Sequence, residues 1–189
     1  LRGRSMYRRI AEYISAVERS QRGNYMIFFP SYRFMEDVYV EFTELAPDAD
    51  TVVQTQFMNE KEREDFLERF EISDNGTSLI GFCVMGGIFS EGIDLAADRL
   101  IGAVVVGTGL PQVCSEREIV KKYFDSRGTR GFDYAYLYPG MNKVLQSAGR
   151  VIRTEEDRGV ILLLDDRFRQ KQYQDLFPRE WKVSRICRV

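Results

Sequence analysis

The sequence predicts a three-layer α/β domain with a mostly parallel central sheet and helices on both faces. Two patterns lead to this prediction. Five short segments are rich in apolar residues, and most are continuous apolar runs, which is typical of strands buried on both faces of a parallel sheet. They alternate with four or five segments of helical character, and this alternation indicates right-handed crossovers between parallel strands. Ligands of such sheets bind beyond the carboxyl ends of the strands.

The first two helices and the strand between them are expected near the N-terminus. Apolar side chains recur at helical spacing over residues 4–22, and Gly23 ends this helix. Residues 25–29 form a continuous apolar strand. Ser31 is expected to cap the second helix, which runs to about Leu45, because a serine side chain satisfies a free backbone N–H at a helix start.

The middle of the chain predicts two further strands and a charged helix. Residues 51–55 form a short strand, and residues 78–85 a longer one that leads into a pair of glycines. Between them, Asn59 is expected to cap a helix that places Phe66 and Phe70 on one face.

The C-terminal part continues the alternation. Strands are expected over residues 100–106 and 160–164, and helices over residues 116–127 and 133–153. Residues 168–189 are expected to form a basic, aromatic tail.

The chain is expected to be one domain of a longer protein. Its length of 189 residues fits a single domain, and it begins with Leu1 where a complete protein begins with methionine. No apolar run of about 18 residues predicts a membrane helix, and no signal peptide opens the chain. Three widely spaced cysteines suggest reduced thiols, so we expect a cytoplasmic protein.

The composition excludes several kinds of chemistry. The chain has no histidine, which removes histidine-based catalytic triads and histidine-ligated metal sites. Three cysteines are too few for a four-cysteine iron–sulfur or zinc site within this chain, so no metal ligands are expected here. Carboxylates, arginine, lysine, tyrosine, serine and backbone groups remain available.

Charge is unevenly distributed, although the net charge is only −2. Residues 1–22 carry six arginines against two glutamates, residues 36–74 carry thirteen acidic against three basic side chains, and residues 167–189 carry seven basic against two acidic ones. Such charged blocks are typical of solvent-exposed helix faces. The alternative for the acidic block, residues 36–74, is a face that docks a partner. The small net charge argues against broad attraction to nucleic acid and leaves room only for a localised contact.

The most informative stretch covers residues 146–153, which read QSAGRVIR. On a continuous helix, Gln146, Arg150 and Arg153 share one face because they are spaced at i, i+4 and i+7. Two arginines on one face match the geometry of a phosphate group. Gly149 inside a helix costs about 1 kcal/mol relative to alanine, so a close approach is expected there. The alternative is a surface helix with two salt-bridged arginines.

A second stretch covers residues 86–94, which read GGIFSEGID. Its three glycines allow backbone conformations and close approaches that other residues resist. Glu91 and Asp94 offer carboxylates that accept hydrogen bonds from sugar hydroxyls or orient an arginine or a water. The alternative is a tight loop that caps a helix. No Gly-Lys-Ser/Thr follows, and neither this loop nor residues 107–109 match G-x-G-x-x-G, so Walker A and dinucleotide-binding loops are disfavoured.

Together these segments resemble the second, C-terminal motor domain of superfamily 2 ATP-dependent DNA helicases of the XPD/DinG type. Residues 146–153 are similar to helicase motif VI, Q-x-x-G-R-x-I-R, and residues 89–94 are similar to motif V. Residues 28–32, which read FFPSY, resemble the motif IV region. The resemblance covers roughly residues 4–180 and implies a RecA-like fold of the P-loop NTPase kind.

The resemblance implies roles in ATP hydrolysis. Arg153 is then the arginine finger that reaches the γ-phosphate of ATP held on a partner motor domain, and Arg150 makes a second phosphate or inter-motif contact. Gln146 helps to position the nucleotide and the attacking water. Gly92 and Asp94 lie near the ribose and the domain interface.

The resemblance also implies contacts with single-stranded DNA. Ser31, Tyr32 and Ser90 face the nucleic-acid backbone, while Glu91 ties motif V to motif VI on the nucleotide side. An aromatic ring such as Tyr32 can stack on an unpaired base for about 1–3 kcal/mol, or it can simply pack within the domain.

The chain lacks Walker A and the D-E-A-H box, which the family carries on its N-terminal motor domain. That domain is therefore the expected partner within the same polypeptide and the main holder of ATP and Mg²⁺, and the chain alone is expected to be inactive. An iron–sulfur cluster elsewhere in a longer polypeptide is neither indicated nor excluded. The rival hypothesis is a non-catalytic α/β module that binds a protein or nucleic acid.

Overall fold

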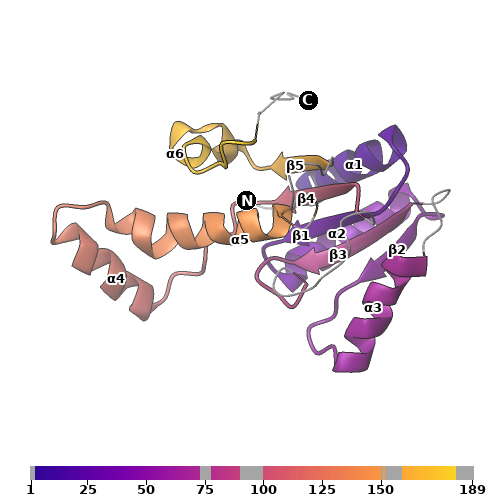
Figure 1. The fold of residues 1–189 in the computed structure, drawn as a ribbon, viewed down its shortest axis with the longest axis horizontal. Helices are drawn as coiled ribbons and strands as arrows, with labels where there is room; N and C mark the ends of the chain where they lie inside the picture. Colours follow the sequence, from indigo (N-terminus) through magenta and orange to yellow (C-terminus); the bar gives the residue numbers. More distant parts are fainter. Residues whose placement is uncertain (1–2, 73–77, 90–99, 150, 152–158, 182–189) are drawn as a thin grey trace.

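The computed structural model describes residues 3–72, 78–89, 100–149, 151 and 159–181. Within these ranges, five parallel strands form one sheet in the order β2-β3-β1-β4-β5 (Figure 1). The strands are β1 (Tyr25–Phe29), β2 (Asp50–Val53), β3 (Leu79–Val84), β4 (Gly102–Val106) and β5 (Val160–Leu164). The prediction of a parallel sheet is confirmed.

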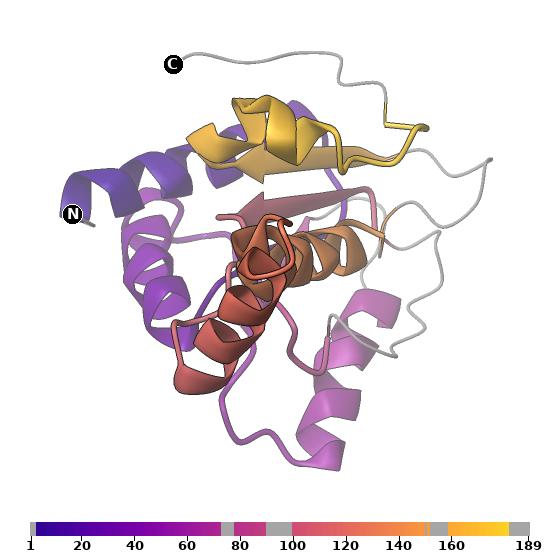
Figure 2. The same cartoon turned by 90° about the vertical axis from the view of Figure 1, so that its left-hand side faces the viewer.

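Helices cover both faces of the sheet. They are α1 (Arg4–Ser20), α2 (Tyr32–Leu45), α3 (Glu60–Ile72), α4 (Ser115–Asp125), α5 (Tyr138–Ala148) and α6 (Lys171–Gln174), with a π-helical turn η2 (Asp133–Leu137) and a 3-10 turn η3 (Asp166–Arg169). Helices α1 and α2 lie on one side of the sheet, and α3 and α5 lie on the other (Figure 2). The three layers that the sequence predicts are therefore present.

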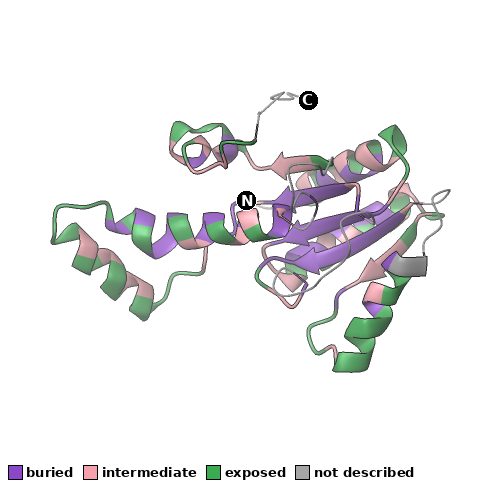
Figure 3. Ribbon diagram, viewed as in Figure 1, coloured by how far each residue is buried: buried purple, intermediate pink, exposed green. Residues whose placement is uncertain are grey.

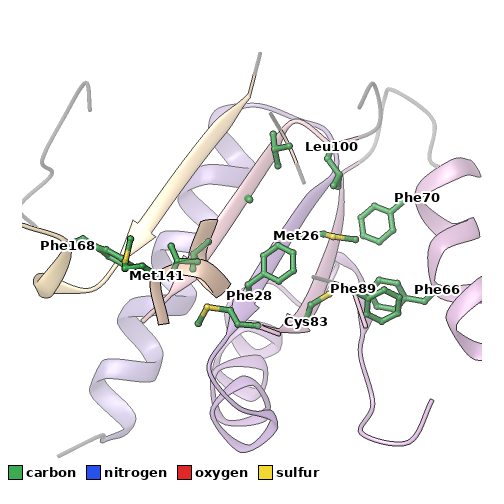
Figure 4. Packing of buried hydrophobic residues seen from close by; sticks show 14 of the residues in the cluster. Met26, Phe28, Phe66, Phe70, Cys83, Phe89, Leu100, Met141 and Phe168 are labelled. Atoms are coloured by element: carbon green, nitrogen blue, oxygen red, sulfur yellow. The ribbon is translucent and has the colours of Figure 1, made fainter. Parts of the chain in front are cut away.

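Alternate residues of the central strand β1 serve the two cores. Tyr25, Ile27 and Phe29 pack with α1 and α2, whereas Met26 and Phe28 pack toward α3 and α5. Every residue of β1, β3 and β4 is buried (Figure 3), which explains why these strands read as continuous apolar runs. Figure 4 shows the second of these cores, where sulfur-containing and aromatic side chains meet.

Two predicted helix caps are present. The Ser31 hydroxyl accepts a hydrogen bond from Phe34 N (3.4 Å) at the start of α2. At the start of α3, Asn59 Oδ1 accepts from Glu62 N (3.0 Å) and Glu62 Oε2 accepts from Asn59 N (2.7 Å). This reciprocal pair is a capping box, which satisfies two backbone donors at once.

Two expectations for the C-terminal part are corrected. The helix expected over residues 133–153 ends at Ala148, because Gly149 caps it and Val151 lies in a turn against Gly159. The segment after Arg167, expected to be a tail, folds back onto the domain as far as it is described. Phe168 and Tyr173 are buried in the same core as side chains of α5 and β5, so η3 and α6 are part of the domain.

A helical arm, residues 113–138, extends beyond the carboxyl ends of the strands (Figure 1). It consists of α4, the turn after it and η2, which continues directly into α5. Arg117 Nη1 donates to Ala135 O (2.8 Å), and Tyr136 Oη donates to Glu118 Oε1 (2.6 Å). These bonds join the two halves of the arm. Among the residues described, none of the helices is both long and apolar enough to cross a membrane.

Candidate functional site

The loops that follow the parallel strands meet at one edge of the sheet, and a buried glutamine connects three of them. Gln54 follows β2 and is 2% exposed. Its Oε1 accepts from Val84 N (2.8 Å) at the end of β3, and its Nε2 donates to the Tyr32 hydroxyl (2.9 Å) after β1. Its own backbone N donates to Phe82 O (2.8 Å), which extends the ladder between β2 and β3. Gln54 therefore fixes the relative positions of the loops after β1, β2 and β3.

Sequence reasoning did not identify Gln54. A polar residue directly after a short strand carries no distinctive pattern, and its partners lie 22 and 30 residues away in the chain. The available signal was the position itself, at the carboxyl end of a predicted parallel strand.

Ser31 and Tyr32 lie at this edge, as predicted. The Ser31 side chain is occupied as the cap of α2, and Tyr32 is the first residue of that helix. The Tyr32 ring is half-buried, and burial is the main cause that raises the pKa of its hydroxyl above the ordinary value. Gln54 Nε2 donates to this hydroxyl and so holds it in place.

The first glycines of the loop after β3 have structural reasons of their own. Gly86 has φ +69°, a left-handed conformation that favours glycine. A Cβ at Gly87 would lie 3.0 Å from Gln54 Nε2 and 3.0 Å from Val84 O, so the glycine allows the buried glutamine to approach. These two glycines therefore serve packing within the domain. Ser90, Glu91, Gly92 and Asp94, the predicted motif V residues, lie outside the described residues.

The loop after β4 packs closely against the beginning of α5. Gly107 and Gly109 have φ of +82° and +62°. A Cβ at Gly109 would lie 2.8 Å from Gly140 O, and one at Gly140 would lie 2.7 Å from Thr108 O. This contact fixes the start of α5 at the carboxyl edge of the sheet.

The predicted motif VI lies at the far end of α5. Gln146 is exposed near the end of that helix. Gly149 is not a mid-helix glycine, as the sequence suggested, but the C-cap, with an ordinary φ of −65°. The helix that carries Gln146 therefore ends two residues after it, at Ala148. Arg150 and Arg153 themselves lie outside the described residues.

The structure thus describes three of the nine predicted site residues, which are Ser31, Tyr32 and Gln146. Ser31 and Tyr32 lie together at the carboxyl edge of the sheet. Gln146 lies near the C-terminal end of α5, whereas the N-terminal end of that helix packs at the carboxyl edge. Val151, within the predicted motif VI, is buried.

Residues 14–184 match the family model of the helicase C-terminal domain. Among curated proteins, a probable ATP-dependent helicase of Methanocaldococcus jannaschii is 29% identical over 160 residues, which is 77% of this chain and 24% of the relative. The XPD/RAD3 helicase subunit of the general transcription and DNA repair factor IIH of Saccharomyces cerevisiae is 31% identical over 79% of this chain and 20% of its own length. The ATP-dependent DNA helicase DinG of Photobacterium profundum is 32% identical over 78% of this chain and 21% of its own length.

Solved structures give the same fold. A structure titled XPD_APO matches with a TM-score of 0.74 at 21% identity, over 93% of this chain and 35% of that one. This likeness identifies the RecA-like arrangement that the sequence predicted. The chain spans about a quarter or less of the length of the curated relatives named above.

Proposed function

Because the chain belongs to the helicase C-terminal domain family, we propose that it is the second motor domain of an ATP-dependent DNA helicase. The observation that carries the proposal is the family match over residues 14–184, which contains all five strands of the sheet and the predicted motifs. Its proposed partner is an N-terminal motor domain of the same polypeptide, which supplies Walker A. Single-stranded DNA is the proposed track.

On this proposal, ATP lies between the two motor domains. Arg153 and Arg150 reach its phosphates from this chain, because an arginine supplied across an interface stabilises the charge that develops on the transferred phosphoryl group. Gln146 supports this arrangement, since it is exposed just before these positions and is free of the core. Gly92 and Asp94 contribute the contacts near the ribose.

Mg²⁺ supplies charge neutralisation at the phosphates when it is bound. Within the part of the chain that the structure describes, no group of three or more cysteine, aspartate or glutamate side chains is placed to hold a metal ion. As the family resemblance implies, we assign the Mg²⁺ ligands to the partner domain and give this chain the role of completing the nucleotide site with arginines.

The DNA contact is assigned to the carboxyl edge of the sheet. Tyr32 offers a ring for stacking, and Gln54 holds its hydroxyl, so the ring has a fixed direction. Ser31 and Ser90 border the same track, and Glu91 links motif V to motif VI. Closure of the two motor domains on ATP and reopening after hydrolysis then step the protein along the strand.

The test is ATP hydrolysis by the chain alone and by a polypeptide that carries both motor domains. We expect no turnover from the chain alone and DNA-stimulated turnover from the two-domain polypeptide. Robust hydrolysis by the chain alone would contradict the proposal. In the two-domain polypeptide, Tyr32→Ala weakens binding to single-stranded DNA by about 5-fold or more, while Tyr32→Phe keeps the ring and most of the affinity. If the two variants bound single-stranded DNA with equal affinity, the Tyr32 ring would not be a DNA contact.

A further inference from the structure

The arm carries most of the exposed apolar surface of the described residues. Ten large hydrophobic side chains are exposed within the described ranges, and seven of them lie between Val113 and Tyr138. Patches of this kind mark interaction sites more often than isolated exposed residues do. Leu137, at the base of the arm, is the one described residue of the arm that belongs to either core, and the exposed apolar side chains lie outside both cores. Figure 3 shows exposed residues along the arm.

Four aromatic rings of the arm form a connected ladder. Phe124 and Tyr134 are stacked, with centroids 3.9 Å apart and planes 8° from parallel. Tyr123 contacts Phe124 edge-on at 5.3 Å, and Tyr138 contacts Tyr134 edge-on at 5.2 Å. Despite these contacts, Tyr123, Tyr134 and Tyr138 remain 49%, 42% and 37% exposed. The ladder therefore presents aromatic surface to solvent in a fixed geometry.

Two cations lie close to Tyr123, Lys122 as its neighbour in the chain and Arg127 over its ring. The other basic side chains of residues 121–130 are ion-paired, Lys121 with Glu118 (3.9 Å) and Arg130 with Asp133 (3.3 Å), and the single acidic side chain of this stretch, Asp125, accepts from Gly131 N (2.8 Å). The Arg127 guanidinium lies 4.3 Å from the centroid of the Tyr123 ring, and Lys122 is exposed on the preceding turn of α4. Flat rings beside positive charges suit a ligand with π-faces and a negatively charged backbone, which is the chemistry of single-stranded nucleic acid.

The position of the arm agrees with this chemistry. Gly140, just beyond the ladder, packs on the loop after β4, so the arm is anchored at the carboxyl edge that also holds Tyr32. Single-stranded DNA that binds along this edge of the sheet would therefore also reach the arm.

We propose that the ladder of Tyr123, Phe124, Tyr134 and Tyr138 is a stacking surface for unpaired bases of single-stranded DNA, with Lys122 and Arg127 contacting adjacent phosphates. This inference rests on the proposed function and adds a second DNA contact to it. The bonds between the halves of the arm hold the ladder rigid, so little ordering accompanies binding.

The test measures binding of the 189-residue chain to two fluorescein-labelled 20-mers by anisotropy. One is oligothymidylate, and the other has the same phosphates but abasic sugars. We expect the wild-type chain to bind the abasic strand about 5- to 150-fold more weakly, which is the loss of one stacked base. Equal affinities for the two strands would overturn the proposal, as would the absence of binding to oligothymidylate.

Ring variants locate the effect. Tyr123→Leu and Tyr134→Leu keep an apolar side chain but lose the ring plane, and each is expected to weaken oligothymidylate binding about 5-fold or more without changing abasic binding. Tyr134→Phe retains wild-type affinity. Lys122→Ala weakens binding to both strands alike, because it removes a phosphate contact. Wild-type affinity of both leucine variants would overturn the proposal.

Ile119→Ser is the matched control, since Ile119 is an exposed apolar side chain of α4 outside the ladder. It leaves DNA binding unchanged if rings and not general apolar surface bind the strand. An Ile119→Ser variant that loses DNA binding as the ring variants do would overturn the proposal, because general apolar surface and not the rings would then bind the DNA. Circular dichroism establishes that each variant keeps its helices, and Tyr123→Leu serves where Tyr134→Leu does not fold. The proposed motor function is judged separately, by ATP hydrolysis of the two-domain polypeptide.

Discussion

Gln54 offers a sharp test of how the carboxyl edge is built. Gln54→Leu replaces the amide with an apolar side chain one atom shorter, so the bond to Val84 N and the bond to the Tyr32 hydroxyl are both lost. Losing the buried bond to Val84 N costs about 1–3 kcal/mol, and losing the half-buried bond to the tyrosine hydroxyl costs about 0.5–1.5 kcal/mol. The free energy of unfolding is therefore expected to fall by about 1.5–4.5 kcal/mol.

Urea denaturation followed by circular dichroism measures this change. Gln56→Leu is the matched control, because Gln56 is exposed and two residues away, and it is expected to stay within about 0.5 kcal/mol of the wild-type chain. If Gln54→Leu were as stable as Gln56→Leu, the account of Gln54 as the link between three loops would be wrong. In the two-domain polypeptide, Gln54→Leu also weakens DNA binding, since the Tyr32 ring loses its fixed direction.

Three further predictions follow from local environments. Cys83 is buried, and that burial raises the pKa of its thiol, whereas Cys114 is exposed. A thiol reagent at pH 8 is therefore expected to modify Cys114 in the native chain and to reach Cys83 only in denaturant. Modification of Cys83 in the native chain would count against this packing. A hydrogen bond to a glutamate of α4 raises the pKa of Tyr136 to about 12. The stability that this bond contributes is therefore complete below about pH 10 and is lost as the pH rises through about 12. Tyr136→Phe is expected to abolish this part of the alkaline transition of the arm, and an unchanged transition would argue against the bond. Gly109 and Gly128 both have positive φ, but only Gly109 lies close to a carbonyl of α5. In thermal unfolding, Gly109→Ala is therefore expected to destabilise the chain by about 1–3 kcal/mol more than Gly128→Ala does. Equal losses of stability in the two variants would contradict the close contact.

Local patterns made most of the fold predictable. The caps at Ser31 and Asn59 depend on residues three positions apart, and the strands depend on continuous apolar runs, so both are visible in the sequence. The end of α5 was misjudged because apolar spacing continues past Ala148 while Gly149, a weak signal inside a helical pattern, ends the helix.

The site was less predictable than the fold. Motif resemblance proposed Ser31, Tyr32 and Gln146 as site residues, whereas the role of Gln54 depends on three strands that meet only after the sheet forms. The arm was predicted as two helices, yet nothing in their periodicity indicated that rings from α4 and η2 stack on each other. Long-range pairs of this kind follow from tertiary structure and leave no fixed spacing in the sequence.

The central claim is that this chain completes an ATPase site with an arginine. The most direct measurement is steady-state ATP hydrolysis by a two-domain polypeptide with Arg153→Ala, alongside its affinity for ATP. The account predicts that turnover falls by about 10³- to 10⁵-fold while ATP still binds. Wild-type turnover in this variant would contradict it.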